Sequence, residues 1–380
     1  MPSKQSDFLH VLSDSTGVSL SDVGRIVTFL GLPARGRLPA HRESEDTYFG
    51  LVDDSINVLE ALRCRYRSAI AEGYVPPKFP AHVQIQTIAG CNASCVMCAM
   101  SMPKIRQLQR GVMPDDLYHR IVGECSRAAA CEELALYLQN EPLLDRDLPR
   151  RIRVAKELSR GRLRVRIVTN GNLLTARVID DLIAGGLDGI AVSLNAHSPR
   201  TYQRVMGGLD YELTRNNIEL LLEKAPPSLF VSITFIVIAE NEREIEDAIS
   251  YWSERGVYCG AYGVNTLAGT LTEFDAIQPK QAKTRTKECY LPFESIGVLA
   301  TGEVILCCTD WGRLSLSGNL TTQPLEAIWH SRDVAEFRRQ ALLGFLNHKM
   351  CADCLGQTRV RENLLYQGGP GSNREKGHTN

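Results

Sequence analysis

The sequence predicts an α/β fold over residues 81–270, a partial, TIM-like (β/α)6 barrel. Short apolar segments rich in β-branched residues alternate there with amphipathic segments, which implies a parallel sheet with right-handed crossovers. Six such units are too few to close an eight-stranded barrel, so we expect an open one. The expected strands are Val83–Ile88, Leu134–Leu138, Val165–Thr169, Gly189–Asn195, Leu229–Ile238 and Gly260–Val264. The expected helices are Asp115–Arg127, Asp147–Leu158, Thr175–Ala184, Tyr211–Leu222 and Glu242–Arg255.

Composition narrows the class of protein. The chain has 380 residues, of which 44% are hydrophobic, and a formal net charge of -1. This balance argues against nucleic acid as a partner, and we interpret the arginine-rich run 146–166 as a solvated helix face. No apolar run approaches the roughly 18 residues of a membrane span, and no signal-peptide pattern begins the chain, so a cytoplasmic protein is expected. In that compartment, the 12 cysteines indicate metal binding or catalysis rather than disulfides.

Residues 1–80 are expected to form a helical extension. Ser21 can cap a short helix, and Asp54 or Ser55 can cap a longer one that runs to Ala71. Cys64 lies within the longer helix and is expected to serve packing. The Pro76-Pro77 pair then marks a boundary. The extension would cover the barrel or contribute to substrate recognition.

Three cysteines directly follow the first expected strand. Cys91, Cys95 and Cys98 have the spacing C-x3-C-x2-C and lie at a carboxyl strand end, where α/β barrels keep their chemistry. Thiolates hold soft metals, and an iron–sulfur cube needs four ligands. A loop with three therefore leaves one iron open to a small molecule. A zinc site or redox-active cysteines are the alternatives.

This motif resembles that of the radical SAM superfamily. The resemblance implies a 4Fe–4S cluster whose open iron chelates the amino and carboxylate groups of S-adenosyl-L-methionine. That family commonly has an aromatic residue before the third cysteine, where this chain has Met97. Methionine is flexible and can pack apolar surface at the same place.

Polar residues at the following strand ends extend the resemblance. Glu141 closes a segment at the place of the family's Gly-Gly-Glu motif, although other residues replace the glycines, and it would receive the methionine amino group. Asn170 lies in a turn at the barrel mouth. Ser193 stands where the family contacts the ribose hydroxyls, and Arg204 where it pairs with the methionine carboxylate. Taken singly, each could be a capping or surface residue.

A second set of cysteines lies near the C-terminus. Cys289, Cys307, Cys351 and Cys354 give four thiolates, the complement of a fully protein-ligated cluster. The segment Ile296–Cys307 is expected to form a β-hairpin that turns at Thr301-Gly302, and helices are expected near Leu325–Trp329 and at Val334–Leu343. A zinc ribbon is the alternative for these four thiols.

The order of this second set resembles the twitch domain, the shortened form of the SPASM extension of radical SAM enzymes. Its members include 2-deoxy-scyllo-inosamine dehydrogenase, and the resemblance implies one auxiliary 4Fe–4S cluster in a small α+β domain over residues 271–366. Residues 367–380 are expected to be disordered. Cys308 could replace its neighbour Cys307 as a ligand, whereas Cys125 and Cys131 are expected to be structural.

Three functions remain open at this point. The first is a radical dehydrogenase acting on a sugar, an aminocyclitol or a similar small metabolite, with flavodoxin or ferredoxin as electron donor. The second is a peptide-modifying enzyme that crosslinks or epimerises residues; an epimerase needs a thiol that returns a hydrogen atom, and Cys259 or Cys308 could supply it. The third is a non-catalytic iron–sulfur or zinc scaffold, which the series of polar strand ends makes the weakest of the three.

Overall fold

The structure is a computed structural model that describes residues 78–108, 111–279, 289, 291–342, 348–352, 354 and 359–362. The expected N-terminal helices with Cys64 and the expected disordered tail lie outside these residues. Within them, no helix is both long enough and apolar enough to cross a membrane.

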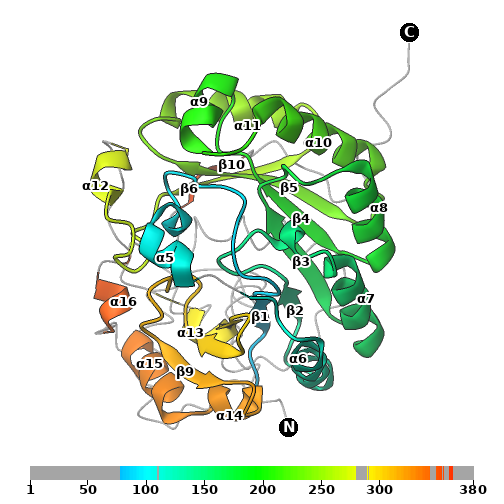
Figure 1. Cartoon of the computed structure of the whole chain (residues 1–380), viewed down its shortest axis with the longest axis vertical. Coiled ribbons are helices and arrows are strands. Elements are labelled where there is room, and N and C mark those ends of the chain that lie inside the picture. The colour runs from blue at the N-terminus through cyan, green and yellow to red at the C-terminus, as the bar shows by residue number, and fades with distance from the viewer. Residues whose placement is uncertain are drawn as a thin grey trace, which may run out of the picture.

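Six parallel strands form the barrel in the described part of the chain, as predicted (Figure 1). Each pairs with its neighbour in sequence, in the order β6-β5-β4-β3-β2-β1. Their bounds are β1 (His82–Ile85), β2 (Glu133–Ala135), β3 (Arg164–Thr169), β4 (Gly189–Ser193), β5 (Phe230–Val237) and β6 (Tyr258–Gly263). Because all six run the same way, their carboxyl ends meet at one edge of the sheet.

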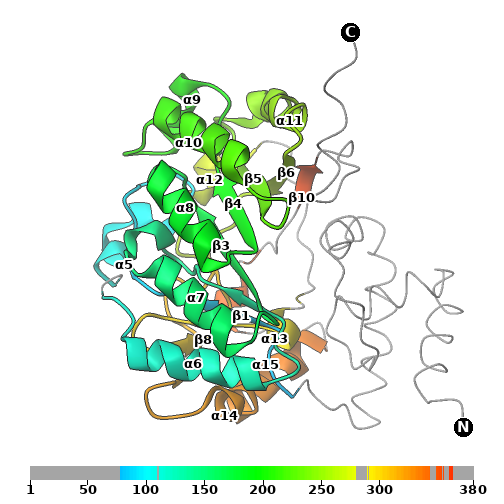
Figure 2. The same ribbon diagram turned by 90° about the vertical axis from the view of Figure 1, so that its right-hand side faces the viewer.

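The helices lie along the outside of the curved sheet, as Figures 1 and 2 show for α7, α8 and α10. The crossover helices are α6 (Asp115–Arg127), α7 (Leu148–Leu158), α8 (Ala176–Gly185), α9 (Pro199–Val205), α10 (Tyr211–Lys224) and α11 (Ile245–Ser253). Side-chain caps set several of their starts: the side chains of Thr175, Ser198 and Asp210 accept hydrogen bonds from Val178, Thr201 and Leu213 N–H groups, respectively.

The two faces of the parallel strands differ in polarity. Ile167, Ile190 and Ile233 share one hydrophobic core with apolar residues of the helices. The alternate positions face inward and are partly exposed and more polar, among them Arg166, Ser193 and Thr234. This period-two alternation keeps polar groups on the concave side of the open barrel.

The C-terminal segment extends the same sheet at both edges. Strand β7 (Ser295–Val298) pairs in parallel with β1, and β8 (Glu303–Ile305) and β9 (Leu316–Asn319) continue from it in antiparallel order. At the opposite edge, β10 (Arg359–Glu362) pairs antiparallel with β6. These strands cover edges that an open barrel would leave unpaired.

Local predictions in this segment are confirmed. The expected hairpin is β7–β8, and Gly302 in its turn has φ 85°, which favours glycine. The expected helices are α14 (Leu325–Trp329) and α15 (Arg332–Leu342). The remaining short helices are α5 (Pro103–Leu108), α12 (Phe274–Ile277), α13 (Leu291–Glu294) and α16 (Lys349–Ala352), with 3-10 turns at Ala99–Ser101, Pro142–Leu144 and Glu242–Glu244.

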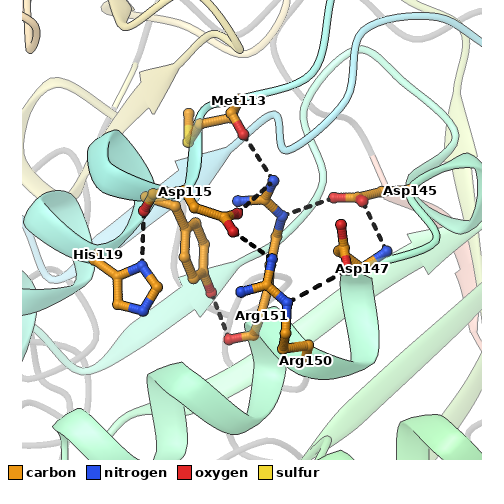
Figure 3. Close-up of polar contacts among 8 residues, drawn as sticks. Met113, Asp115, His119, Asp145, Asp147, Arg150 and Arg151 are labelled. Atoms are coloured by element: carbon orange, nitrogen blue, oxygen red, sulfur yellow. Dashed lines mark hydrogen bonds and ion pairs between the residues drawn. The ribbon is translucent and has the colours of Figure 1, made fainter.

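The interpretation of the arginine-rich run as a solvated helix face is wrong for several of its members. Arg164 and Arg166 lie on β3, and Arg151 is only 2% exposed. Its guanidinium pairs with Asp145 (Nε–Oδ2, 3.0 Å) and donates from Nη2 to the Met113 carbonyl (2.7 Å), as Figure 3 shows. The Asp145 carboxylate and the Met113 carbonyl offset part of the cost of burying this charge, and the guanidinium joins α7 to the segment before α6.

Candidate active site

The three cysteines of the first motif, hereafter the triad, lie in a loop that is fixed by the chain after α9. Ser94 N–H donates to the Gly207 carbonyl (2.8 Å), and Val96 N–H donates to the Val205 carbonyl (3.0 Å). A Cβ at Gly207 would stand 2.8 Å from the Ser94 carbonyl oxygen, closer than such contacts allow. The loop therefore requires glycine there, and two segments distant in sequence set its shape.

The thiols of the triad are near one another and largely buried. Burial raises the pKa of all three; that of Cys98 rises to about 11, and the charges of Cys98 and Cys91 further raise the pKa of Cys95. Three mutually destabilising thiolates are a donor set that binding to a cationic centre would stabilise.

Among the described residues, no three His, Cys, Asp or Glu side chains converge closely enough to hold a single metal ion. In an iron–sulfur cube each cysteine binds a separate iron, so its ligands need not meet at one point. The soft, clustered thiols of the triad fit such a group.

Glu141 lies where β2 and β3 end, and it is 2% exposed. Its Oε1 accepts from Thr169 Oγ1 (2.7 Å) and Leu143 N (3.0 Å), and its Oε2 accepts from Asn170 N (2.8 Å). Burial raises the pKa of this carboxyl to about 7, although the three hydrogen bonds oppose the rise. The Glu141 charge in turn raises the pKa of Cys91, so this carboxyl lies near the triad. Its contact with a methionine amino group stays a prediction.

Asn170 is brought against the triad. Its Nδ2 donates to Asn92 Oδ1 (2.7 Å) and lies 4.0 Å from Cys91 Sγ. Because its backbone N–H also binds Glu141, one turn after β3 links the carboxyl to the first cysteine. The turn has φ 76° at Gly171.

Ser193 and Arg204 lie elsewhere around the mouth. Ser193 Oγ is 3.2 Å from Thr234 Oγ1 on the next strand, on the inward side of the sheet. Arg204, at the end of α9, is half-exposed and forms an ion pair with Glu240. Their roles toward the ribose and the methionine carboxylate stay predictions.

The four cysteines of the second set lie near one another in the structure. Burial and the charges of Cys307, Cys354 and Cys351 all raise the pKa of Cys289, which places the four close together. The pKa of Cys307 falls to about 7 because it accepts from the Cys308 thiol and lies 3.1 Å from Thr309 Oγ1. The lowered pKa of Cys307 favours it over Cys308 as a ligand, and this assignment stays a prediction. Four converging thiols fit a fully protein-ligated cluster.

The two cysteines considered as hydrogen donors differ in position. Cys259 has 0% exposure and faces the helix side of β6, within the hydrophobic core, and burial raises its pKa to about 12. It lies on the wrong side of the sheet to meet a substrate inside the barrel. Cys308 is half-buried and lies within electrostatic range of Tyr137, whose neighbour Arg166 is on the inward side of the sheet. Cys125 and Cys131 lie in the core, as expected.

The sequence analysis did not identify Trp311, which belongs to an apolar cluster beside the triad. Trp311 is buried with Met100 and Ile105, and this cluster packs against Cys91 and Cys98. Asp310, at 0% exposure, builds the loop that carries it by accepting from Leu314 N, Ser315 N and Ser315 Oγ. The Asp310-Trp311-Gly312 turn signal was visible in the sequence, but nothing local says which cysteine loop it covers.

Comparison with protein families gives two matches that together span most of the described chain. Residues 85–251 match the radical SAM superfamily, and residues 289–355 match SPASM, an iron–sulfur cluster-binding domain. Among curated relatives, the probable GTP 3',8-cyclase of Methanococcus aeolicus is 31% identical over 117 residues, 31% of this chain and 38% of that protein. The AdoMet-dependent heme synthase of Methanosarcina barkeri is 28% identical over 204 residues, 53% of this chain and 55% of that protein. The chain thus matches only about half or less of either relative.

Solved structures share the fold at low identity. BtrN in complex with AdoMet and 2-DOIA has a TM-score of 0.53 and 17% identity, covering 73% of this chain and 94% of that one. SuiB of Streptococcus suis bound to precursor peptide SuiA has a TM-score of 0.58 and 13% identity, covering 76% and 75%. With the triad in the loop after β1 and four more thiols close together in the C-terminal segment, the chain belongs to the radical SAM superfamily and carries a SPASM-type cluster-binding domain, with a cluster that binds S-adenosylmethionine and an auxiliary cluster.

Proposed function

We propose that this radical SAM enzyme dehydrogenates a hydroxyl-bearing carbon of a sugar-like or aminocyclitol-like metabolite in natural-product biosynthesis. The observation that carries the proposal is the convergence of Cys289, Cys307, Cys351 and Cys354. Four protein thiolates saturate a cluster, so the auxiliary site is suited to accept an electron rather than to chelate substrate.

The proposed reaction assigns separate roles to the two clusters, to S-adenosylmethionine and to the side chains around them. Cys91, Cys95 and Cys98 would hold a cluster that, with S-adenosylmethionine, would supply the radical chemistry that removes a hydrogen atom from carbon. Cys289, Cys307, Cys351 and Cys354 would hold a cluster able to accept an electron. Glu141, Asn170, Ser193 and Arg204 are proposed to orient the cofactor. The buried cluster that contains Trp311 and packs against Cys91 and Cys98 would exclude water from the reacting atoms.

The fold likeness to BtrN supports a small-molecule substrate, because it covers 94% of that chain, with AdoMet and 2-DOIA bound. We further propose a cytoplasmic setting, where thiols stay reduced, and a reduced flavodoxin or ferredoxin as electron donor. The division into a barrel over residues 81–270 and an auxiliary-cluster domain over 271–366 is part of the same proposal.

A peptide substrate is the second candidate. SuiB has a comparable fold match with its precursor peptide SuiA bound, and in that reading crosslinking or epimerisation replaces oxidation. Cys308 is better placed than Cys259 to return a hydrogen atom, because Cys259 lies in the core.

Turnover in D2O followed by mass spectrometry separates these candidates. A dehydrogenase yields a product two mass units lighter without deuterium on carbon, and its activity survives Cys259→Ala and Cys308→Ala. An epimerase yields a product with one carbon-bound deuterium, and the label disappears in the cysteine variant that supplies the hydrogen. We expect the first result with an aminocyclitol; deuterium on carbon would refute the dehydrogenase reading.

A further inference from the structure

Gln139 lies on the segment that connects the triad loop with the loop of the auxiliary cysteine Cys307. Its neighbour Asn140 forms a parallel bridge with Gly90, the residue before the triad. Gln139 Nε2 donates to the carbonyl of Cys308 (3.0 Å), directly after the auxiliary cysteine Cys307. A substrate that gives a hydrogen atom at one site and an electron at the other must lie between the same two loops.

The carbonyl of Cys308 fixes how the Gln139 amide is oriented. A carbonyl can only accept, so the end of the amide that faces it must be the NH2 group. The other end, Oε1, is then an acceptor; it is buried, and within the described chain no group donates to it. Gln139 as a whole is 8% exposed, so bulk water is a poor substitute. A buried acceptor without a donor is unfavourable unless a ligand supplies one.

Two further features of this segment are energetically unfavourable: the backbone conformation of Gln139 and the buried side-chain amide of Asn140. Gln139 has φ 55°, in the left-handed region that a glycine would adopt without strain. Asn140 Oδ1 accepts from Leu138 N (2.8 Å), which leaves Nδ2 buried, and it too has no partner among the described residues. Two adjacent amides therefore each use one end internally and present the other, one acceptor and one donor.

We propose that Gln139 is a substrate-positioning residue whose Oε1 accepts a hydrogen bond from the hydroxyl of the carbon that is oxidised. This inference rests on the proposed function, and it names the recognised chemistry: a polyhydroxylated small molecule with an O–H donor at the reacting carbon. The bond from Nε2 to Cys308 holds that acceptor at a set position relative to the auxiliary loop. An ether or an unsubstituted alkyl carbon would leave Oε1 unpaired.

Binding without turnover tests this directly. Protein reconstituted with both clusters and S-adenosylmethionine, kept anaerobic and without reductant, is titrated by calorimetry with 2-deoxy-scyllo-inosamine. A second titration uses the analogue with fluorine in place of the hydroxyl at the oxidised carbon, which keeps the size but cannot donate. We expect wild-type protein to prefer the hydroxyl compound about tenfold, about 1.4 kcal/mol. Gln139→Met should bind both compounds within about twofold of each other, since it has no acceptor.

Matched variants separate recognition from structure. Gln278→Met changes a glutamine whose Nε2 bonds to Asp275 on the exposed surface, and it should behave as wild type. Iron content and melting temperature check that each variant is folded. Should Gln139→Met not fold, Gln139→Asn, which withdraws the amide by one methylene, takes its place with the same expectation.

The outcomes distinguish the two proposals. If Gln139→Met or Gln139→Asn keeps the tenfold preference, Gln139 does not position the hydroxyl, and the proposed oxidation stands on its own. Equal binding of both compounds by wild type refutes the Gln139 inference in the same way. If wild type binds neither compound, the aminocyclitol-like substrate of the proposed function is refuted, and the inference falls with it.

Discussion

A carboxyl group that is both buried and richly hydrogen-bonded marks the junction of β2 and β3. Glu141 accepts from Thr169, Leu143 and Asn170, yet burial still raises its pKa to about 7. The three donors favour the ionised form, but the desolvation of the buried carboxyl opposes them and is the larger effect. A methionine ammonium at this place would stabilise the charge, and the site is thus poised for a cation.

The raised pKa of Glu141 predicts how stability changes with pH. The unfolded carboxyl has an ordinary value near 4.5, so its contribution to the free energy of unfolding is fully present below pH 4.5. That contribution is lost as pH rises through about 7, to a total of about 3 kcal/mol. Urea unfolding of iron-free protein at several pH values should show wild type losing stability across this window relative to Glu141→Gln. A constant difference between the two proteins from pH 4.5 to 8 would contradict the assignment.

Arg204 is predicted to pair with the methionine carboxylate, although in the structure it pairs with Glu240. Both side chains are partly exposed, so their ion pair is weak and readily exchanged. Arg204→Ala should weaken S-adenosylmethionine binding by roughly 1.5–3 kcal/mol, the range for hydrogen bonds to charged groups. Glu240→Gln is the matched control and should leave affinity unchanged or improve it. Equal affinities for Arg204→Ala and wild type would place the carboxylate elsewhere.

At the scale of elements, local signals were enough wherever the deciding contacts are local. The helix Asp115–Arg127 was predicted with the bounds that α6 has, because two acidic residues begin it and Arg127 ends it. The spacing of the triad likewise identified its chemistry. The face of β6 that points into the core could not be predicted, since its tyrosines alternate with the small residues Cys259 and Ala261 and neither set is clearly apolar or polar. The pairing of β7 with β1 depends on contacts more than 200 residues apart, which no local pattern encodes.

The conformation of the triad loop depends on a close contact between Gly207 and Ser94. Gly207→Ala would place a methyl 2.8 Å from both the Ser94 carbonyl oxygen and Ser94 Oγ, so the backbone must shift. We expect this variant to reconstitute with less iron and to cleave S-adenosylmethionine at least tenfold more slowly. Gly123→Ala is the control: in helix α6 its added methyl meets only the flexible end of Arg127, so iron loading should be unchanged. Full iron loading of Gly207→Ala would show that the loop tolerates the shift.

The whole molecule is organised by one sheet of ten described strands, with the barrel at its centre and C-terminal strands at both edges. Side-chain contacts reinforce this join: Leu325 N donates to Glu124 Oε2 (2.7 Å), and Arg313 Nη2 donates to the Leu108 carbonyl (2.9 Å). The auxiliary thiols are thereby held against the barrel. The division at residue 270 nevertheless stays a prediction, because a shared sheet does not say whether the two parts fold independently.

Two separate thiol sets in one framework predict two clusters that load independently. Replacing Cys91, Cys95 and Cys98 together by alanine should abolish formation of 5′-deoxyadenosine with dithionite. The protein should still keep about four irons, the content of one cube, because its other four thiols converge elsewhere.

The reciprocal variant, with alanine at Cys289, Cys307, Cys351 and Cys354, is the control for independence. It should also keep about four irons and still cleave S-adenosylmethionine to 5′-deoxyadenosine, but it should no longer form the oxidised product. Iron and zinc are measured on the same samples. If the triad variant contained zinc and no iron, the second set would be a zinc ribbon, and the electron-accepting role that underlies the proposed oxidation would have to be abandoned.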